Sequence, residues 1–284
     1  MPLRLPAFPS SGKVANSAVS SGLPPRPAGR RRPPPPSVLR SCVAGLLAII
    51  SAWYVPGGAA AEQVIEHPGS LELVYIGYQQ DNPPQLLVKA HTKYFLVDKG
   101  VTIPSINSIY FLEYIRINEG ESVLDIGTGV GIQAIFAADK ASRVVATDIS
   151  PKAVDNARRN VRRYQLEDKV EVRQGDLFGA VRPDEKFDVV LMNIDYPYND
   201  QTQHLWKVHE RFFREVTHYL KPRGRIYYQI GLLDNLPVIR RFARENGLLI
   251  MELHMARAMK KNRELMVYRL ERLPETRNGP ALKQ

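Results

Sequence analysis

The sequence predicts an α/β protein with a doubly wound, mostly parallel sheet of seven strands and a small N-terminal β wing. Three observations support this. From residue 121 onward, short β-branched runs alternate with segments of helical periodicity. A glycine-rich loop joins the first of these runs to a helix, and aspartates stand at the ends of the first three runs. Such alternation is typical of a sheet covered by helices on both faces, which binds its ligands at the carboxyl ends of the strands.

The alternating region, residues 121–273, supplies the strands and helices of the main domain. Runs rich in Val, Ile and Leu predict strands at 122–126, 143–148, 170–174, 187–193, 224–230, 248–254 and 265–270. Helical segments begin near Ile132 and cover 150–165, 203–220 and 235–246. Ser150 and Pro151 are suited to the cap and the first position of the second helix. Together these elements predict a Rossmann-like arrangement.

The preceding segment, residues 62–120, has a different pattern. Three short strand-like runs, at 70–76, 85–90 and 93–98, precede a helical run at 105–115. We interpret them as a β wing and a helix that leads over the carboxyl edge of the sheet. The wing either recognises a substrate or only covers apolar surface. Residues 274–284 are expected to form a tail.

The first 61 residues are not expected to belong to the folded domain. Residues 22–40 are rich in Pro and Arg and cannot build a core. An apolar run at 43–55 is shorter than the about 20 residues that span a bilayer, and it resembles a signal peptide with cleavage after Ala61. This predicts an exported or membrane-associated protein. An organelle transit peptide, or a misplaced start before a cytoplasmic protein, are the alternatives.

The distribution of charge limits what the basic composition means. The net charge is +10, but residues 1–61 contain seven Lys or Arg and no acidic residue. The remaining chain carries 32 basic and 29 acidic residues, and residues 205–284 hold 17 and 8 of them. This basic C-terminal third is either a solvated face or attracts an anionic partner such as a nucleic acid. With Cys42 as the one cysteine and six scattered histidines, neither a disulfide nor a metal site is expected.

The glycine loop points to a ligand other than a dinucleotide. Gly127, Gly129 and Gly131 follow a G-x-G-x-G pattern, whereas dinucleotide-binding loops follow G-x-G-x-x-G. Glycine allows a tight turn and a close approach of the ligand, and the helix start adds free N–H groups. Asp125 before the loop would repel a pyrophosphate but would attract the ammonium of an amino-acid moiety.

Two further aspartates stand at the ends of the next two strands. Asp148 stands 23 residues after Asp125, where its two oxygens can accept hydrogen bonds from the hydroxyls of a ribose. Asp176 follows the third strand and is placed to meet the exocyclic amine of an adenine. Three aspartates around one glycine loop therefore predict a site for a nucleoside joined to an amino acid.

The stretches VLDIGTGVG, ATDISPKAVDNARRN, GDLF and FDVVLMN resemble class I S-adenosylmethionine-dependent methyltransferases. The resemblance covers about residues 85–270 and is closest to the group that includes release-factor glutamine methyltransferases and RNA guanine or adenine amino-methyltransferases. It implies S-adenosyl-L-methionine as the methyl donor. It implies that the cofactor is bound by Asp125, Gly127, Thr128, Gly129, Gly131, Asp148, Ile149, Asp176, Leu177 and Asn193.

In that group, the fourth strand ends in Asn, Asp or Ser, then two prolines, then an aromatic residue. A side-chain oxygen and a backbone carbonyl accept the N–H groups of a planar amine, and the prolines direct the carbonyl. This sequence offers two registers for the motif. Asn193 stands directly after the strand, whereas 195–198 matches three of the four positions. The predicted catalytic residues are Asn193, Asp195, Tyr196, Pro197 and Tyr198.

The sequence thus predicts a methyltransferase that acts on a planar amino group of a protein glutamine or a nucleobase. One alternative is a binding module that retains the fold without catalysis. Another is a methyltransferase acting on an oxygen or carbon of a small molecule, because Asp195 could serve as a base. A nicotinamide oxidoreductase fits the strands but not the glycine spacing. The pattern does not predict the oligomeric state.

Overall fold

The computed structural model describes residues 63–66, 73–79, 85–231, 233–258 and 263–273. The predictions for residues 1–61, including Cys42 and the apolar run at 43–55, and for the tail at 274–284 lie outside these ranges. Within the described ranges, no helix combines the length and the apolar character needed to cross a membrane.

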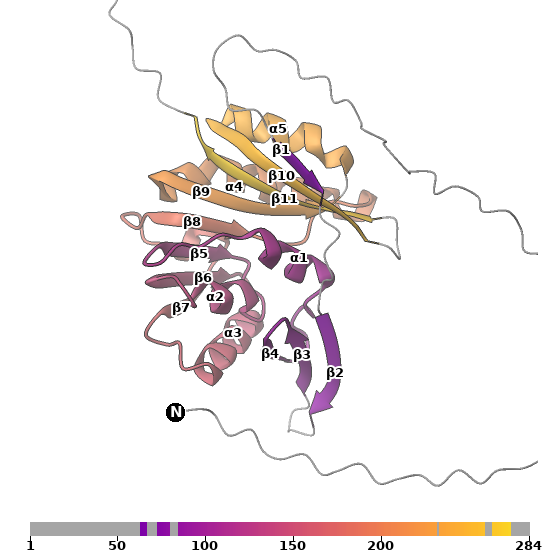
Figure 1. The fold of residues 1–284 in the computed structure, drawn as a ribbon, viewed down its shortest axis with the longest axis vertical. Coiled ribbons are helices and arrows are strands. Elements are labelled where there is room, and N and C mark those ends of the chain that lie inside the picture. Colours follow the sequence, from indigo (N-terminus) through magenta and orange to yellow (C-terminus); the bar gives the residue numbers. More distant parts are fainter. Residues whose placement is uncertain (1–62, 67–72, 80–84, 232, 259–262, 274–284) are drawn as a thin grey trace, which may run out of the picture. The chain divides into compact units, whose positions relative to one another are not determined.

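A sheet of eight strands forms the centre of the described structure (Figure 1). In spatial order they are β1 (Gln63–Glu66), β10 (Leu248–Ala258), β11 (Arg263–Arg272), β9 (Leu220–Gly231), β8 (Phe187–Met192), β5 (Ser122–Ile126), β6 (Arg143–Asp148) and β7 (Val170–Gln174). The five strands from β9 to β7 run parallel, and β11 is antiparallel to both of its neighbours. All seven predicted strands are present, so the fold class is confirmed. The short strand β1 adds an eighth, parallel to β10.

The order of the strands reverses between β5 and β8. After β5 the chain continues to β6 and β7 on one side, and then returns to β8 on the other side. Ile126 at the end of β5 is paired with Thr147 of β6 and with Met192 of β8. The loops after these three strands therefore leave the sheet at one level. In a doubly wound sheet, such a reversal opens a crevice at the carboxyl edge.

Helices cover both faces of this sheet. On one face lie α1 (Ile106–Tyr114), α2 (Ile132–Ala137) and α3 (Pro151–Arg163), and on the other lie α4 (Trp206–Tyr219) and α5 (Leu236–Glu245) (Figure 1). Short 3₁₀ turns follow β7, precede α4 and precede α5: η1 (Leu177–Ala180), η2 (Asp200–Leu205) and η3 (Leu233–Asn235). Val123 and Val189 enter the first core, whereas Leu124 and Val190 enter the second. Continuous apolar runs therefore suit these strands, because both of their faces are buried.

The predicted wing is a separate antiparallel sheet of three strands. They are β2 (Leu73–Gln79), β3 (Gln85–Ala90) and β4 (Lys93–Val97). Val88 and Phe95 are fully buried in the same core as α2 and α3. The ring centroid of Phe95 lies 6.1 Å from that of Phe136 and 6.0 Å from that of Tyr164. The wing therefore shares a core with one face of the main domain.

Three side chains of α3 and its C-cap bind the free edge of β4. Asn156 donates to the carbonyl of Leu96 at 2.7 Å. Asn160 accepts from the Leu96 amide at 3.0 Å and donates to the Leu96 carbonyl at 2.9 Å. The Tyr164 hydroxyl accepts from the Tyr94 amide at 2.6 Å and donates to its carbonyl at 2.8 Å. These side chains are spaced four residues apart on one helix face, and they supply the partners that a neighbouring strand would otherwise provide.

Candidate active site

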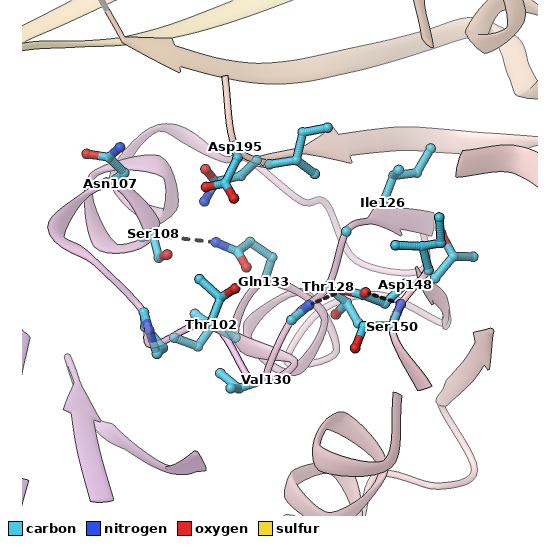
Figure 2. A pocket seen from close by; sticks show the side chains of 18 of the residues that line it. Thr102, Asn107, Ser108, Ile126, Thr128, Val130, Gln133, Asp148, Ser150 and Asp195 are labelled. Atoms are coloured by element: carbon cyan, nitrogen blue, oxygen red, sulfur yellow. Dashed lines mark hydrogen bonds between the residues drawn. The ribbon is translucent and has the colours of Figure 1, made fainter. Parts of the chain in front are cut away.

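A cavity of about 450 Å³ opens at the carboxyl ends of β5, β6, β7 and β8 (Figure 2). Its walls come from the glycine loop after β5, from the residues that follow β6 and β7, and from residues 193–196 after β8. Residues between 102 and 108, which lead from the wing into α1, close another side. The cavity thus lies where the strand order reverses, as expected for a ligand site in this fold.

The glycine loop turns sharply at the end of β5. Gly127, Gly129 and Gly131 have φ angles of +72°, +58° and +90°, in the left-handed region that favours glycine. The amides of Gly127 and Thr128 both donate to the carbonyl of Thr147, at 2.8 and 3.0 Å. Gly127, Thr128 and Gly129 line the cavity, whereas Gly131 caps the start of α2 outside the cavity lining. The backbone of the loop therefore forms the wall itself.

Asp148 joins the end of β6 to the glycine loop. Its Oδ2 accepts from the amide of Gly129 and its Oδ1 from the amide of Ser150, both at 2.9 Å (Figure 2). A carboxylate oxygen has more than one lone pair, so each oxygen can still accept a hydroxyl from the cavity side. The neighbouring Ile149 also lines the cavity and is 66% exposed. A diol beside an apolar planar group would fit these two residues.

Asp176 and Leu177 line the cavity after β7. The Asp176 carboxylate forms an ion pair with Arg211 of α4, a residue that the sequence pattern did not single out. Leu177 has a φ of +50°, although its side chain is buried. A left-handed conformation costs a non-glycine residue roughly 1–2 kcal/mol. Such strain is common where a backbone is shaped for a ligand.

Asp125 lies beneath the glycine loop, outside the lining of the cavity. The residue is 1% exposed, and its Oδ2 accepts a hydrogen bond of 2.6 Å from the Thr128 hydroxyl. Burial raises the pKa of Asp125 to about 7, and the negative charge of Asp148 adds to this rise. A cation in the cavity would lower the pKa of Asp125 again, because an opposite charge favours the ionised carboxylate.

Of the five residues predicted as catalytic, three line the cavity and two do not. Asn193, Asp195 and Tyr196 line the cavity together with Ile194, and we call residues 193–196 the acceptor segment. Asn193 is half-buried, Asp195 is exposed and its side chain points toward the cavity in Figure 2. Pro197 and Tyr198 do not line it, and Tyr198 is 52% exposed.

Two glycines make room for the acceptor segment. A β-carbon added to Gly127 would overlap Cγ2 of Ile194, and one added to Gly231, at the end of β9, would overlap the ring and hydroxyl of Tyr196. Tyr196 is consequently buried, with 9% of its surface exposed. The segment is thus held between the glycine loop and β9.

Behind the acceptor segment lies a buried histidine of α4. Nε2 of His209 is 3.0 Å from the carbonyl oxygen of Asp195, and Nδ1 is 2.6 Å from the hydroxyl of Tyr228. Burial lowers the pKa of His209 to about 4, so the ring is neutral near pH 7. A neutral ring that donates from Nε2 accepts at Nδ1, and Tyr228 is therefore the donor. Asn235 donates to the carbonyls of Gly231 at 2.8 Å and Pro197 at 3.5 Å.

Comparison with known proteins identifies the domain. Residues 123–224 match the family model of a methyltransferase domain. The chain contains a class I methyltransferase domain. Domains of this class use S-adenosyl-L-methionine as methyl donor, so the predicted family and cofactor are both confirmed.

Two bacterial relatives are similar to about half of this chain. A release factor glutamine methyltransferase of Clostridium acetobutylicum is 34% identical over 163 residues, which are 48% of this chain and 57% of that protein. A ribosomal protein L11 methyltransferase of Thermotoga maritima is 34% identical over 147 residues, which are 51% and 50% of the two chains. The chain therefore spans about half the length of these relatives.

A solved structure has the same fold. Trm5 of Methanocaldococcus jannaschii, in complex with adenosine, is similar with a TM-score of 0.53, over 66% of this chain and 56% of that one. At 18% identity, this likeness shows the fold alone.

The cavity of the methyltransferase domain fits the cofactor of its class. A β-carbon on Gly129 would have no atom within 4 Å, so the loop leaves open space on that side. The carboxylate of Asp148 retains acceptor capacity toward a ribose, and Ile149 and Leu177 provide apolar surface for an adenine. Among the described residues, no group of three or more His, Cys, Asp or Glu is arranged to bind a metal ion.

Proposed function

We propose that this protein is an S-adenosylmethionine-dependent methyltransferase that methylates a planar amino group. The supporting observation is that Asn193 and Tyr196 line the same cavity as the glycine loop and Asp148. One cavity thus joins the residues suited to the methyl donor and those suited to an acceptor. This arrangement brings the two reactants together, and such positioning lowers the barrier of a displacement reaction.

In this proposal, the cofactor is held by residues of three strand ends. Asp148 accepts hydrogen bonds from the ribose, while Ile149, Asp176 and Leu177 surround the adenine. The glycine loop and the buried charge of Asp125 stabilise the methionine moiety. When bound, the cofactor supplies a methyl group on a sulfonium, whose sulfur leaves as a neutral thioether.

We assign the acceptor site to the segment 193–196 in preference to 195–198. The support is that Asn193 and Tyr196 both face the cavity, whereas Pro197 and Tyr198 do not line it. The side-chain oxygen of Asn193 and the backbone carbonyl of Ile194 accept the two N–H groups of the amine. This turns the nitrogen lone pair toward the methyl carbon. Once methylated, the nitrogen would release its proton to solvent or to the exposed carboxylate of Asp195.

An amino group of a protein is the first candidate for the acceptor. The charged residues that line the cavity are all aspartates: Asp148, Asp176 and Asp195. A carboxylate-lined cavity favours a neutral amide or an amine over a phosphate. A nucleobase is the second candidate, supported by exposed basic residues of α5 such as Arg241 and Arg244, which could contact a nucleic-acid backbone.

Calorimetry and a transfer assay test this proposal. Titration should show binding of S-adenosylmethionine and no binding of NAD. Incubation with labelled donor and a cell extract should then label a protein fraction, or an RNA fraction if the second candidate is right. The absence of cofactor binding would contradict the proposal as a whole.

Two substitutions test the assigned register. Asn193→Ala should lower transfer by about a hundredfold or more, as expected when a residue that orients the reacting group is lost. Asp195→Ala should retain transfer within about tenfold, because its side chain is not one of the two acceptors. The reverse order of effects would place the acceptor site at 195–198.

A further inference from the structure

We infer that His209 and Tyr228 are positioning residues for methyl transfer, because together they set the direction of the Asp195 carbonyl in the acceptor segment. The inference rests on the proposed function. It is carried by two contacts: His209 Nε2 to the Asp195 carbonyl oxygen at 3.0 Å, and Tyr228 hydroxyl to His209 Nδ1 at 2.6 Å. Neither side chain lines the cavity, so both act through the backbone of the segment.

Tyr228, the first member of the hydrogen-bonded pair, is held on a rigid strand. Tyr228 lies in β9, where its Cα is paired with that of Met192, the last residue of β8 before the acceptor segment. Its side chain is fully buried, with ring centroids of Phe212, Phe213 and Tyr268 at 5.8, 5.1 and 6.0 Å. The hydroxyl is therefore fixed by close packing on several sides.

The imidazole of His209 is equally restricted. It is fully buried, and it meets the rings of Tyr228 and Trp206 edge to face, at centroid distances of 5.7 and 6.0 Å. The hydrogen bond from Tyr228 selects the tautomer that carries its proton on Nε2. That proton can only be donated in one direction, toward the carbonyl of Asp195.

The hydrogen bond from His209 to Asp195 restrains a backbone that has no prolines at positions 194 and 195. The related motif has two prolines after its first residue, and they stiffen the backbone, whereas Ile194 and Asp195 occupy those positions here. With its carbonyl turned to His209, Asp195 offers no carbonyl to the acceptor. An incoming amine is then left with the side chain of Asn193 and the carbonyl of Ile194. His209 thus supplies from α4 the stiffness that prolines would supply from within the loop.

The test compares variants that keep or remove the donor. His209→Phe fills the site without an N–H group, and His209→Gln retains one. Tyr228→Phe removes the hydroxyl that selects the tautomer. Tyr268→Phe is the matched control, because this buried hydroxyl belongs to the same core and donates to the sulfur of Met266 instead. Each variant is examined for cofactor Kd, for kcat and KM of transfer, and for hydrogen exchange of the peptide 193–198.

We expect His209→Phe to lower kcat by about tenfold or more, with cofactor Kd within about twofold of the unchanged protein, since one hydrogen bond is lost away from the cofactor. His209→Gln should recover most of this loss. Tyr228→Phe should lower kcat by about threefold to tenfold. Amides of 193–198 should exchange faster in His209→Phe and not in Tyr268→Phe.

Several results would overturn the inference while leaving the proposed function intact. One is transfer by His209→Phe equal to that of Tyr268→Phe. Another is a parallel loss of cofactor binding and transfer, which would mean a general structural role. If the unchanged protein neither binds cofactor nor transfers a methyl group, the proposed function fails. Hydrogen exchange then tests the backbone contact by itself: faster exchange of 193–198 in His209→Phe would show that His209 fixes this segment, and unchanged exchange would overturn that as well.

Discussion

Gly127 and Ile194 lie so close together that a β-carbon on Gly127 would overlap Cγ2 of Ile194. Gly127 begins the glycine loop, and Ile194 belongs to the acceptor segment. Their contact therefore sets the separation between the part of the cavity that suits the methyl donor and the part that suits its acceptor. Position 127 requires glycine for two reasons: the close contact with Ile194 and the φ of +72°.

The first prediction concerns this contact. Gly127→Ala should weaken S-adenosylmethionine binding by about tenfold or more, because the loop must shift to relieve the overlap. The left-handed backbone should in addition lower the free energy of unfolding by roughly 1–2 kcal/mol. Calorimetry and urea unfolding measure the two effects. Ile194→Ala alone should retain binding, and the double variant should regain the binding lost to overlap but not the stability lost to strain. Unchanged binding in Gly127→Ala would contradict the prediction.

The second prediction concerns the pH dependence of cofactor binding through Asp125. Its pKa is raised from 3.8 to about 7 by burial, so the folded protein holds a proton that the unfolded chain has released. The stability that this group contributes is fully present below about pH 4 and is lost as the pH rises through about 7. A cationic ligand favours the ionised carboxylate. Binding of S-adenosylmethionine should therefore tighten by up to about tenfold between about pH 6 and pH 8.

Calorimetry at several pH values, in buffers of different ionisation enthalpy, should show proton release on binding below about pH 7. Asp125→Asn provides the control, since its amide does not titrate. The variant should bind more weakly and should lose both the proton release and the pH dependence. An unchanged pH profile in Asp125→Asn would assign the effect to another group.

The third prediction concerns the link between the wing and the glycine loop. Asn160 is fully buried and bonds the amide and carbonyl of Leu96 in β4 and the carbonyl of Val130 in the loop, at 2.9–3.0 Å. Asn160→Leu keeps the size of the side chain but leaves these groups without their partner. We expect a loss of roughly 2–4 kcal/mol in the free energy of unfolding and weaker cofactor binding.

Asn156→Leu is the matched variant for this experiment. Asn156 is also fully buried, and it bonds the Leu96 carbonyl at 2.7 Å and the Asp98 amide at 2.8 Å. These contacts reach the wing but not the glycine loop. Asn156→Leu should lower the free energy of unfolding about as much as Asn160→Leu does, while the cofactor Kd stays close to that of the unchanged protein. Equal effects of both variants on Kd would contradict a specific role for the bond to Val130.

The fourth prediction concerns acid stability. Glu185 is buried, which opposes ionisation, but hydrogen bonds from Arg173 at 2.7 and 3.0 Å and a contact with Arg143 lower its pKa to about 2. The stability that the ionised Glu185 carboxylate contributes to the fold is fully present above about pH 4.5 and is lost as the pH falls toward 2. Glu185→Gln should cost about 2 kcal/mol near pH 6, and the difference should shrink near pH 3. Urea unfolding at both values measures it. Glu167→Gln, at an exposed position, should show neither effect.

Much of the cavity was predicted because its signals are local. Gly127, Gly129, Asp148, Asp176 and Leu177 each stand at the end of a strand or within the loop that follows it. Parallel strands bring such residues to one edge whatever the details of packing. Asn156, Asn160 and Tyr164 carried a readable signal that was missed. Polar residues at a spacing of four, on the buried side of an amphipathic helix, indicate buried hydrogen-bond partners.

The acceptor segment shows where local signals end. Both registers of the motif fit the sequence, and which residues face the cavity depends on contacts with Gly127, Gly231 and His209. His209 lies within an ordinary amphipathic helix, so its spacing does not reveal its partner. Arg211, which pairs with Asp176, is equally hidden in the same helix.

The sequence by itself determined the fold class, the glycine loop and the aspartates at the strand ends, because strand periodicity and the conformational freedom of glycine act over a few residues. The tertiary structure alone decided which side of residues 193–198 lines the cavity. That choice depends on side chains more than ten positions away, brought into contact only when α4 and β9 pack against the end of β8. Such long-range packing depends on the volumes and hydrogen-bond directions of several elements at once, which no single stretch of sequence specifies.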